Sequence, residues 1–335
     1  MSTIAYLGAG SWGLTLAWLG VQCPERRVRL WDRDPVKIAR FCENRTIQFP
    51  IEVTLPPEVS LTSSLEEAAA GADVIVFAVT SAGTREVAQA LARTGVVSEQ
   101  TILVNASKGI EYPSLTRLSA VMQEIFPKNP LAALSGPTLA PEILKGLPTA
   151  GVIASDSSAV AERLQALLAT DRFRLYTNTD VVGVELGGAL KNIFAIVSGY
   201  MDARHLGDNA RATLITRGLA EITRFSLALG ADVQTLYGLS GLGDLLATCY
   251  SPLSRNYQVG YRLAQGQTLE HILAQMKVVA EGVQTTQAVS LLSDNLGIEM
   301  PVVKQVEQAL SGALSEREMI HTLMSRRPKA EHTRC

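Results

Sequence analysis

Residues 3–22, TIAYLGAGSWGLTLAWLGVQ, decide how the first half of the chain folds. The apolar run TIAYL is typical of a buried strand, and it leads directly into Gly8, Gly10 and Gly13 in GxGxxG spacing before a helical run. A second strand pattern, VRLWD, ends at Asp32, 19 positions after Gly13. Strand, glycine turn, helix and acidic strand end together predict a complete dinucleotide-binding unit.

Each glycine has a physical role in such a unit. Gly8 permits the tight turn, Gly10 lets the backbone approach the pyrophosphate, and Gly13 lets the helix pack closely on the strand. The phosphates bind at the positive N-terminal end of that helix. The spacing therefore predicts a nucleotide cofactor.

The end of the second strand bears on the choice between NAD(H) and NADP(H). Asp32 can accept hydrogen bonds from the adenosine ribose hydroxyls and repel a 2′-phosphate. Arg33 can instead bind that phosphate through two parallel hydrogen bonds. The pair leaves both cofactors open, with Asp32 favouring NAD.

Strand and helix patterns continue to alternate up to about residue 178. The unbroken apolar strand ADVIVFAV is typical of a parallel sheet covered on both faces, so we predict an α/β fold with an N-terminal Rossmann-type doubly wound sheet. Ligands bind at the carboxyl ends of such strands. The sequence places Lys108 and the turn containing Gly136 there, and Thr138 is expected to cap the next helix.

From about residue 180 onward the alternation stops and long helical patterns follow. They are broken at Gly207, Gly230, Gly266 and Gly297. We therefore predict a Rossmann domain over residues 1–179 and an all-helical, substrate-binding C-terminal domain over residues 180–335.

One lysine interrupts an apolar helical pattern in residues 179–224, which contain no proline. Lys191 follows Gly187 and Gly188, and a glycine weakens a helix by roughly 1 kcal/mol relative to alanine. Close approach by another backbone or by a ligand would offset that loss. Lys191 has no acidic residue four positions later, unlike many surface lysines, so we predict that Lys191 and Asn192 belong to a site.

Three further segments of the helical domain carry polar side chains. Asp244 lies in a glycine-rich segment, either as a helix cap or as a carboxylate near Lys191. Residues 254–256, Ser-Arg-Asn, begin a predicted helix, whose positive end suits a phosphate or an oxyanion. Glu281 precedes another helix, either as a partner of the helix dipole or as a cofactor contact.

Composition and charge narrow the classes of function. The 30 basic and 32 acidic residues leave a net charge of -2, which offers no electrostatic footprint for nucleic acid or for an anionic membrane surface. The four cysteines and four histidines are scattered without metal-ligand spacing, so no metal site is predicted. With no secretory signal and no run of 18 apolar residues, we expect a cytoplasmic protein that inserts into no membrane.

Taken in order, these motifs resemble those of the NAD(P)-dependent glycerol-3-phosphate dehydrogenase family in its bacterial form. The segments are GAGSWGLTLA, SKGIE, LSGPTLAPE, VGVELGGALKNIFAIVSGYMDA, LGDNARATLITRGLAE, GLSGLGDLLATC, SRN and AEGV, which extend over nearly the whole chain. The resemblance implies NAD(P)H-dependent, reversible reduction of dihydroxyacetone phosphate to sn-glycerol 3-phosphate, which supplies glycerophospholipid synthesis.

The resemblance also implies roles for individual residues. Lys191 would donate and accept the proton at the C2 oxygen, framed by Asp244 and Lys108, and Asn192 would support it. The implied substrate contacts are Lys108, Gly136, Thr138, Lys191, Asp244, Ser254, Arg255 and Asn256. The dinucleotide-binding unit and the resemblance together give the expected cofactor contacts. These are Gly8, Gly10, Ser11, Trp12, Gly13, Asp32, Arg33, Lys108, Ala140, Arg255, Val279 and Glu281.

Two alternatives stay open at this point. Another two-domain dehydrogenase, such as a 3-hydroxyacid dehydrogenase, would bind a carboxylate where a phosphate is expected, and the Ser-Arg-Asn segment with Lys108 favours the phosphate. A non-catalytic dinucleotide sensor would keep the glycines but would not need Lys191, Asp244 and Lys108 together. The apolar helices of the second domain could provide the surface of a homodimer.

Overall fold

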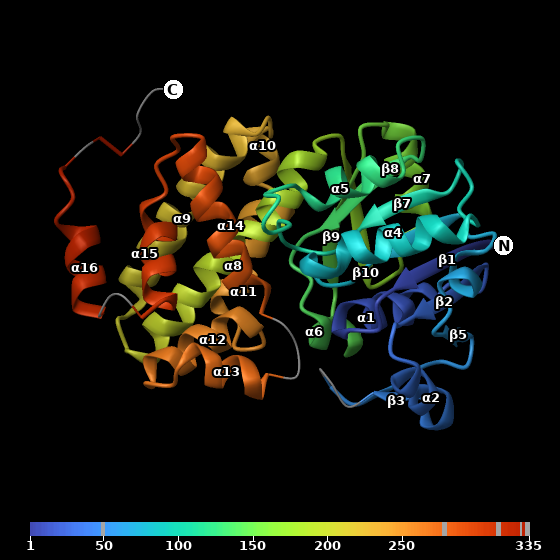
Figure 1. The fold of residues 1–335 in the computed structure, drawn as a ribbon. Helices are drawn as coiled ribbons and strands as arrows, with labels where there is room; N and C mark the ends of the chain where they lie inside the picture. The colour runs from blue at the N-terminus through green and yellow to red at the C-terminus, as the bar shows by residue number, and fades with distance from the viewer. Residues whose placement is uncertain (48–50, 277–279, 313–315, 329, 332–335) are drawn as a thin grey trace.

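The structure is a computed structural model of the chain that describes residues 1–47, 51–276, 280–312, 316–328 and 330–331. An α/β domain and an all-helical region lie side by side (Figure 1). Of the described strands, β10 (Phe173–Asn178) comes last in the chain, and α8 (Val181–Ala203) then begins the helical region. The predicted fold class, a Rossmann-type sheet followed by helices, is confirmed.

Within the described residues, eight strands form the main sheet in the order β10-β9-β8-β7-β6-β1-β2-β5. The strands not yet given are β1 (Ser2–Leu7), β2 (Arg26–Trp31), β5 (Val59–Thr62), β6 (Val74–Phe77), β7 (Ile102–Asn105), β8 (Leu131–Ser135) and β9 (Thr149–Ala154), and β3 (Thr46–Ile47) pairs with β4 (Val53–Thr54) separately. Neighbours in the main sheet are parallel except β8 and β9, which the apolar patterns did not indicate. The strand order reverses between β1 and β6, where such sheets bind ligands outside the strand ends.

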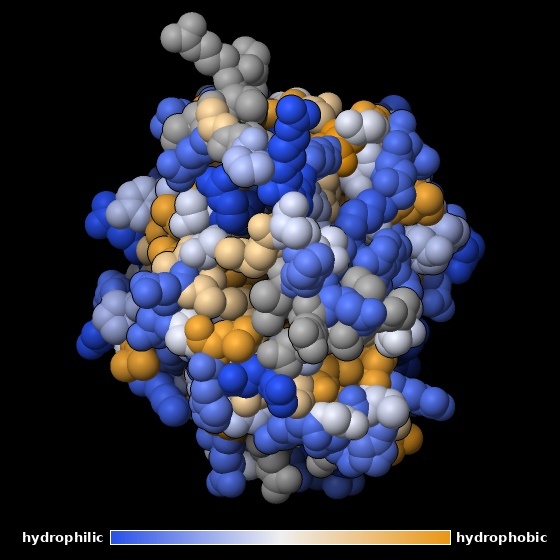
Figure 2. Space-filling model, turned by 90° about the vertical axis from the view of Figure 1, so that its left-hand side faces the viewer, coloured by the Kyte–Doolittle hydropathy of each residue, from blue (hydrophilic) through white to orange (hydrophobic). Residues whose placement is uncertain are grey.

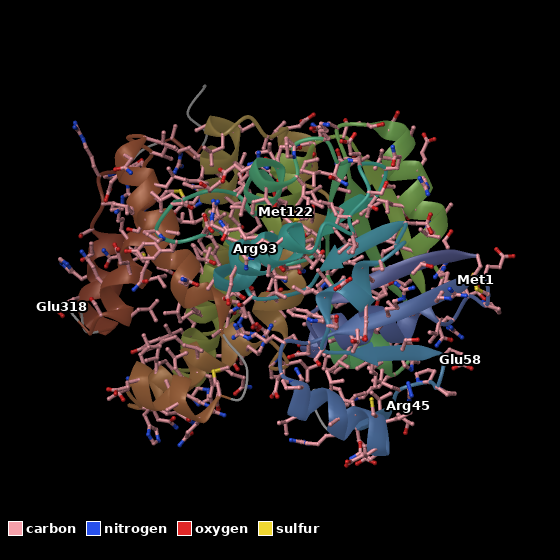
Figure 3. All side chains as sticks on the ribbon, turned by 45° about the vertical axis from the view of Figure 1, so that its right-hand side comes forward. Met1, Arg45, Glu58, Arg93, Met122 and Glu318 are labelled. Atoms are coloured by element: carbon pink, nitrogen blue, oxygen red, sulfur yellow. The ribbon has the colours of Figure 1, made fainter. Side chains whose placement is uncertain are left out.

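Helices cover both faces of the main sheet. One face carries α1 (Ser11–Gly20), α2 (Pro35–Asn44), α6 (Ala140–Leu144) and α7 (Ser158–Leu168), and the other carries α3 (Leu65–Ala69), α4 (Thr84–Thr94) and α5 (Leu118–Ile125). Ile4 and Tyr6 of β1 pack on the first face, whereas Ala5 and Leu7 pack on the second. Because both faces are buried, strands read as continuous apolar runs. Met122 of α5 is fully buried in this packing (Figure 3).

The helical region is built around α8. The remaining elements are α9 (Asp208–Ala228), α10 (Val233–Leu236), a π-helical turn η2 (Leu239–Gly243), α11 (Asp244–Tyr250), α12 (Arg255–Ala264), α13 (Leu269–Gln275), α14 (Glu281–Asn295), α15 (Pro301–Leu310) and α16 (Glu316–Met324). α8 packs against α9, α11, α12 and α14. It is long and apolar enough to span a membrane, but 89% of its most apolar window is buried, so it is a core helix. Figure 2 shows the outer end of this region, where polar residues predominate and hydrophobic residues form small separate patches.

The glycines predicted to break the helices do so. Gly207, Gly230, Gly266 and Gly297 each have a positive φ beside a helix end, a backbone conformation that glycine adopts without a steric penalty. The predicted breaks are therefore confirmed.

The glycines before Lys191 allow α8 to approach its neighbours closely. A Cβ on Gly188 would lie 2.2 Å from Ser135 Oγ of β8, and one on Gly187 would lie 2.5 Å from the Ser240 carbonyl oxygen of η2. Close backbone approach is thus the reason that glycine is tolerated inside this helix. It also brings the helix that carries Lys191 against the sheet.

Candidate active site

A cleft of about 230 Å³ opens between the sheet and the helical region. Its walls are the loops after β1, β6, β7 and β8, the middle of α8, and the N-terminal ends of α12 and α14. The predicted site residues that line it are Gly10, Ser11, Trp12, Lys108, Thr138, Ala140, Lys191, Asn192, Ser254, Arg255, Asn256 and Glu281. The fold therefore brings together residues predicted from both halves of the sequence.

Asp244 joins two lysines that line this cleft. Its Oδ2 accepts a hydrogen bond from Lys108 Nζ at 2.8 Å, and its Oδ1 accepts one from Lys191 Nζ. Asp244 is 1% exposed and Lys191 is 6% exposed, so these charges interact with little screening by water. Of the two interpretations of Asp244, the structure supports the carboxylate near Lys191, because Gly243 occupies the N-cap position of α11.

The surroundings of Lys191 change its protonation. Burial lowers the pKa of Lys191 to about 7; Asp244 acts in the opposite direction and Lys108 lowers the pKa further. Thr248 Oγ1 accepts a second hydrogen bond from Nζ at 2.7 Å. Thr248 was not predicted from the sequence. Its position, four residues after Asp244, places it on the same face of a helix and could have indicated it. A lysine with a pKa near neutrality can both donate and accept a proton.

Lys108 is also held by the turn after β8. Its Nζ donates to the Gly136 carbonyl oxygen at 2.8 Å and to Thr138 Oγ1 at 3.1 Å. Gly136 has a φ of +133° and does not line the cleft itself. The prediction that Thr138 caps the next helix is wrong: Leu139 is the N-cap of α6, and the Thr138 hydroxyl hydrogen-bonds to Gly136 and Lys108 instead.

The N-terminal end of α12 presents polar groups to the cleft. As predicted, Ser254 precedes a helix, and its Oγ accepts from the Tyr257 N–H at 3.3 Å. Asn256 Oδ1 accepts from the Gly282 N–H at 2.9 Å, which joins α12 to α14. Burial lowers the pKa of Arg255, although the nearby Glu281 opposes that change. A guanidinium at a positive helix end is suited to an anion.

The glycine loop has the geometry of a pyrophosphate site. Gly8 has a φ of +109°, and a Cβ on Gly13 would lie 1.8 Å from the Gly8 carbonyl oxygen. A Cβ on Gly10 would meet no described atom within 4 Å, and no side chain caps α1. The first amides of α1 therefore stand at an open space that can hold phosphate groups. These residues fit a dinucleotide.

Family models described as the N-terminus and the C-terminus of NAD-dependent glycerol-3-phosphate dehydrogenase match residues 3–161 and 180–321. The chain belongs to the NAD-dependent glycerol-3-phosphate dehydrogenase family. The resemblance seen in the motifs is confirmed, and the chain is an NAD(P)-dependent oxidoreductase with glycerol-3-phosphate dehydrogenase activity.

Full-length relatives support this assignment. The NAD(P)+-type glycerol-3-phosphate dehydrogenase of Citrifermentans bemidjiense is 45% identical over 332 residues, covering 98% of each chain. The enzyme of the same name from a Nostoc species is 44% identical and covers 99% of each chain. The crystal structure of glycerol-3-phosphate dehydrogenase from Coxiella burnetii superposes with a TM-score of 0.90 at 34% identity, covering 97% of this chain and 99% of that one.

In this member of the glycerol-3-phosphate dehydrogenase family, Asp32 and Arg33 lie outside the residues that line the cleft. Asp32 Oδ2 accepts from the Ala9 N–H at 3.0 Å and from Lys37 Nζ at 2.6 Å. The Arg33 side chain is 74% exposed. Asp32 therefore holds the glycine loop in place, and Lys37 compensates its charge.

Glu281 of the dehydrogenase connects the two parts of the chain. Its carboxylate accepts from the Ser81 N–H at 3.1 Å and from the Ser81 hydroxyl, in the turn η1 (Ser81–Gly83) after β6. Burial raises the pKa of Glu281. The predicted cofactor contact Val279 lies outside the residues that the structure describes. In the described part of the chain, no group of three or more His, Cys, Asp and Glu residues could hold a metal ion.

Proposed function

We propose that the chain reversibly reduces dihydroxyacetone phosphate to sn-glycerol 3-phosphate, with Lys191 as the proton donor. The observation that carries this proposal is that Asp244 holds Lys191 and Lys108 together, and both lysines line the cleft between the glycine loop and α12. When bound, the nicotinamide supplies a hydride to C2 of the substrate. Lys191 supplies the proton to the C2 oxygen, so the carbonyl gains one hydride and one proton and becomes a hydroxyl.

Lys191 acts on the C2 oxygen in two ways. Before the proton moves, its ammonium stabilises the negative charge that develops on the oxygen, and low exposure strengthens this interaction. Asn192 lines the cleft beside it and supports the same oxygen. Asp244 and Thr248 hold Nζ in place. In the oxidative direction the neutral amine of Lys191 accepts the proton.

The substrate phosphate binds at the N-terminal end of α12. Ser254, Arg255 and Asn256 line that end of the cleft, and the dipole of the ten-residue helix favours an anion there. Lys108, with Gly136 and Thr138 behind it, positions the substrate from the side of the sheet. A phosphate site at one end of the cleft and a proton donor at the other would together fix the position of C2.

The glycine loop would hold the cofactor, and we propose that both NAD(H) and NADP(H) would be accepted. The proposed contacts from the sheet side are Gly8, Gly10, Ser11, Trp12, Gly13, Asp32, Arg33, Lys108 and Ala140, and those from the helical region are Arg255, Val279 and Glu281. The ion pair between Lys37 and Asp32 supports acceptance of NADP(H), because a compensated carboxylate repels a 2′-phosphate less.

Residues 1–179 form the cofactor-binding domain and residues 180–335 the substrate-binding domain of this proposal. The enzyme works in the cytoplasm, binds no nucleic acid, inserts into no membrane, and supplies glycerophospholipid synthesis. It forms a homodimer through the helical region, where Leu227, Leu291 and Leu296 are 39%, 42% and 47% exposed. Light scattering after size-exclusion chromatography tests the dimer, and a monomer mass would contradict it.

The experiment that tests the reaction is a turnover assay of the purified protein with dihydroxyacetone phosphate and either NADH or NADPH. We expect loss of reduced-nicotinamide absorbance with both cofactors. Lys191→Ala should abolish turnover while cofactor binding, measured by nicotinamide fluorescence, survives. The control is Lys128→Ala, whose side chain is 71% exposed and lies outside the cleft. No turnover of the wild type refutes the reaction, and activity above a few per cent in Lys191→Ala refutes the proton transfer.

A further inference from the structure

Glu185 is a buried carboxylate on α8 that lies outside the cleft. Its side chain is 5% exposed. Oε1 accepts from Asn105 Nδ2 at 2.7 Å and from the Ser119 N–H at 2.9 Å. Oε2 accepts from Arg117 at 2.9 Å and from Ser119 Oγ at 2.5 Å. These donors all belong to the α/β domain, so the carboxylate fixes α8 against the sheet through charge-assisted hydrogen bonds.

The same contacts reach the loop that carries Lys108. Asn105 is the last residue of β7, and its Oδ1 accepts from the Ser107 N–H at 3.1 Å. Asn105 Nδ2 donates to the Ser107 carbonyl oxygen at 3.2 Å as well as to Glu185. Ser107 Oγ in turn donates at 2.6 Å to the carbonyl oxygen of Val79, two residues after the neighbouring strand β6. The amide that binds Glu185 therefore also holds the turn immediately before Lys108.

Glu185 and Lys191 lie on the same helix. They are six positions apart in the sequence, which is about 9 Å along a helix axis. Lys191 and Lys108 meet at Asp244. The contacts thus form a closed loop that runs from Glu185 through the end of β7 to Lys108, across Asp244 to Lys191, and back along α8.

We propose that Glu185 is a positioning residue for the reaction, which sets the spacing between Lys191 and Lys108 by tying α8 to the carboxyl end of β7. This inference rests on the proposed roles of the two lysines. A misplacement of about 1 Å at a reacting group can lower a rate about 100-fold. Glu185 therefore acts on kcat although it is not among the cleft-lining residues.

Glu221 offers a matched control within the helical region. It is 3% exposed and accepts hydrogen bonds from the Val302 and Val303 N–H groups at 2.7 and 3.2 Å, at the start of α15. It does not line the cleft. Like Glu185→Ala, Glu221→Ala removes a buried carboxylate and leaves backbone N–H groups without their acceptor. Unlike Glu185→Ala, it leaves the contact between α8 and β7 unchanged.

The test compares Glu185→Ala, Glu185→Gln and Glu221→Ala at a temperature where all three are folded. We expect Glu185→Ala to lower kcat about 10- to 100-fold, while cofactor binding by nicotinamide fluorescence is kept. The pH profile of kcat should move upward, because a displaced Lys108 leaves Asp244 more fully paired with Lys191. Glu185→Gln keeps an acceptor for Asn105 and should retain more activity. Glu221→Ala should lose thermal stability but keep the wild-type kcat and pH profile.

Wild-type kcat and an unchanged pH profile in Glu185→Ala would overturn the inference. An equal loss of kcat in Glu221→Ala would also overturn it, since the effect would then be one of stability alone. If Glu185→Ala does not fold, Glu185→Gln and Arg117→Gln decide, because wild-type kcat in both contradicts a positioning role. Absence of turnover in the wild type is a separate result that refutes the proposed function.

Discussion

Lys108 and Asp244 form an ion pair across the boundary between sheet and helices, with 2.8 Å between Nζ and Oδ2. Lys108 follows β7, whereas Asp244 begins α11. The same carboxylate pairs with Lys191 of α8. The single negative charge of Asp244 thus compensates two cations from different parts of the fold. The site therefore forms only when the sheet domain and the helical region pack together.

Asp244→Asn should therefore damage both activity and stability. Removal of one partner of a buried ion pair costs about 3–5 kcal/mol, and we expect kcat to fall by at least about 100-fold. Because Asp244 raises the pKa of Lys191, its loss should also move the pH profile of kcat downward. Turnover assays and thermal unfolding check both effects.

Asp294→Asn is the control, since its pair with Lys304 is exposed and worth about 0–1 kcal/mol. Wild-type turnover in Asp244→Asn would contradict the prediction.

The protonation of Lys191 predicts opposite pH dependences for the two directions of the reaction. Burial lowers its pKa from 10.5 to about 7, so the ammonium predominates below that pH and the amine above it. Reduction consumes a proton from the ammonium, and its kcat should fall as the pH rises through about 7. Oxidation needs the amine, and its kcat should rise over the same interval. Initial rates in both directions between acidic and alkaline pH provide the check, and profiles with the same slope would exclude Lys191 as the shared acid and base.

Lys37 should influence the choice of cofactor. Its Nζ lies 2.6 Å from Asp32 Oδ2, so Lys37→Ala leaves an uncompensated carboxylate beside the glycine loop. We expect kcat/KM for NADPH to fall about tenfold relative to NADH, which corresponds to about 1.4 kcal/mol of repulsion with the 2′-phosphate. Arg40→Ala is the control, because Arg40 is an exposed cation on the same helix. An unchanged NADPH to NADH ratio would show that Asp32 does not sense the 2′-phosphate.

Local sequence patterns predicted the structural features that depend only on residues close together in the chain. The glycine loop, the helix breaks at Gly207 and Gly230 and the helix start at Ser254 each depend on a few neighbouring residues, and the structure has all of them. Lys191 was recognisable because a charge inside an apolar helix needs a partner. The residues alone left two interpretations of Asp244, a helix cap or a carboxylate near Lys191, because a contact across 53 positions leaves no local pattern.

Other features depend on contacts that no local pattern records. A threonine before a helix is normally predicted to be its N-cap. The Thr138 hydroxyl instead accepts a hydrogen bond from Lys108, 30 positions earlier. Asp32 matched the position of a ribose ligand, and its carboxylate accepts from the Ala9 N–H, 23 positions earlier, as well as from Lys37 in the first turn of α2. Glu185 passed unnoticed because its donors come from three separate positions of the α/β domain. Tertiary contacts decided each of these cases.

The contact between Gly188 and Ser135 provides a test of how closely α8 must approach the sheet. A Cβ at Gly188 would lie 2.2 Å from Ser135 Oγ, so Gly188→Ala must push α8 away from β8. Overpacking of this kind costs about 1–3 kcal/mol, although alanine itself favours a helix by about 1 kcal/mol over glycine. We expect a lower melting temperature, and a lower kcat because Lys191 and Lys108 are drawn apart.

Ser135→Ala should rescue Gly188→Ala. It removes the hydroxyl oxygen, and the remaining Ser135 Cβ would lie 3.4 Å from the new methyl group, an ordinary contact. Ser135 Oγ has no hydrogen-bond partner within the described residues, so Ser135→Ala alone should change stability little. A double-mutant cycle on melting temperature and kcat measures the coupling. Additive effects of the two substitutions would mean that Gly188 is needed for a reason other than the approach of α8 to β8.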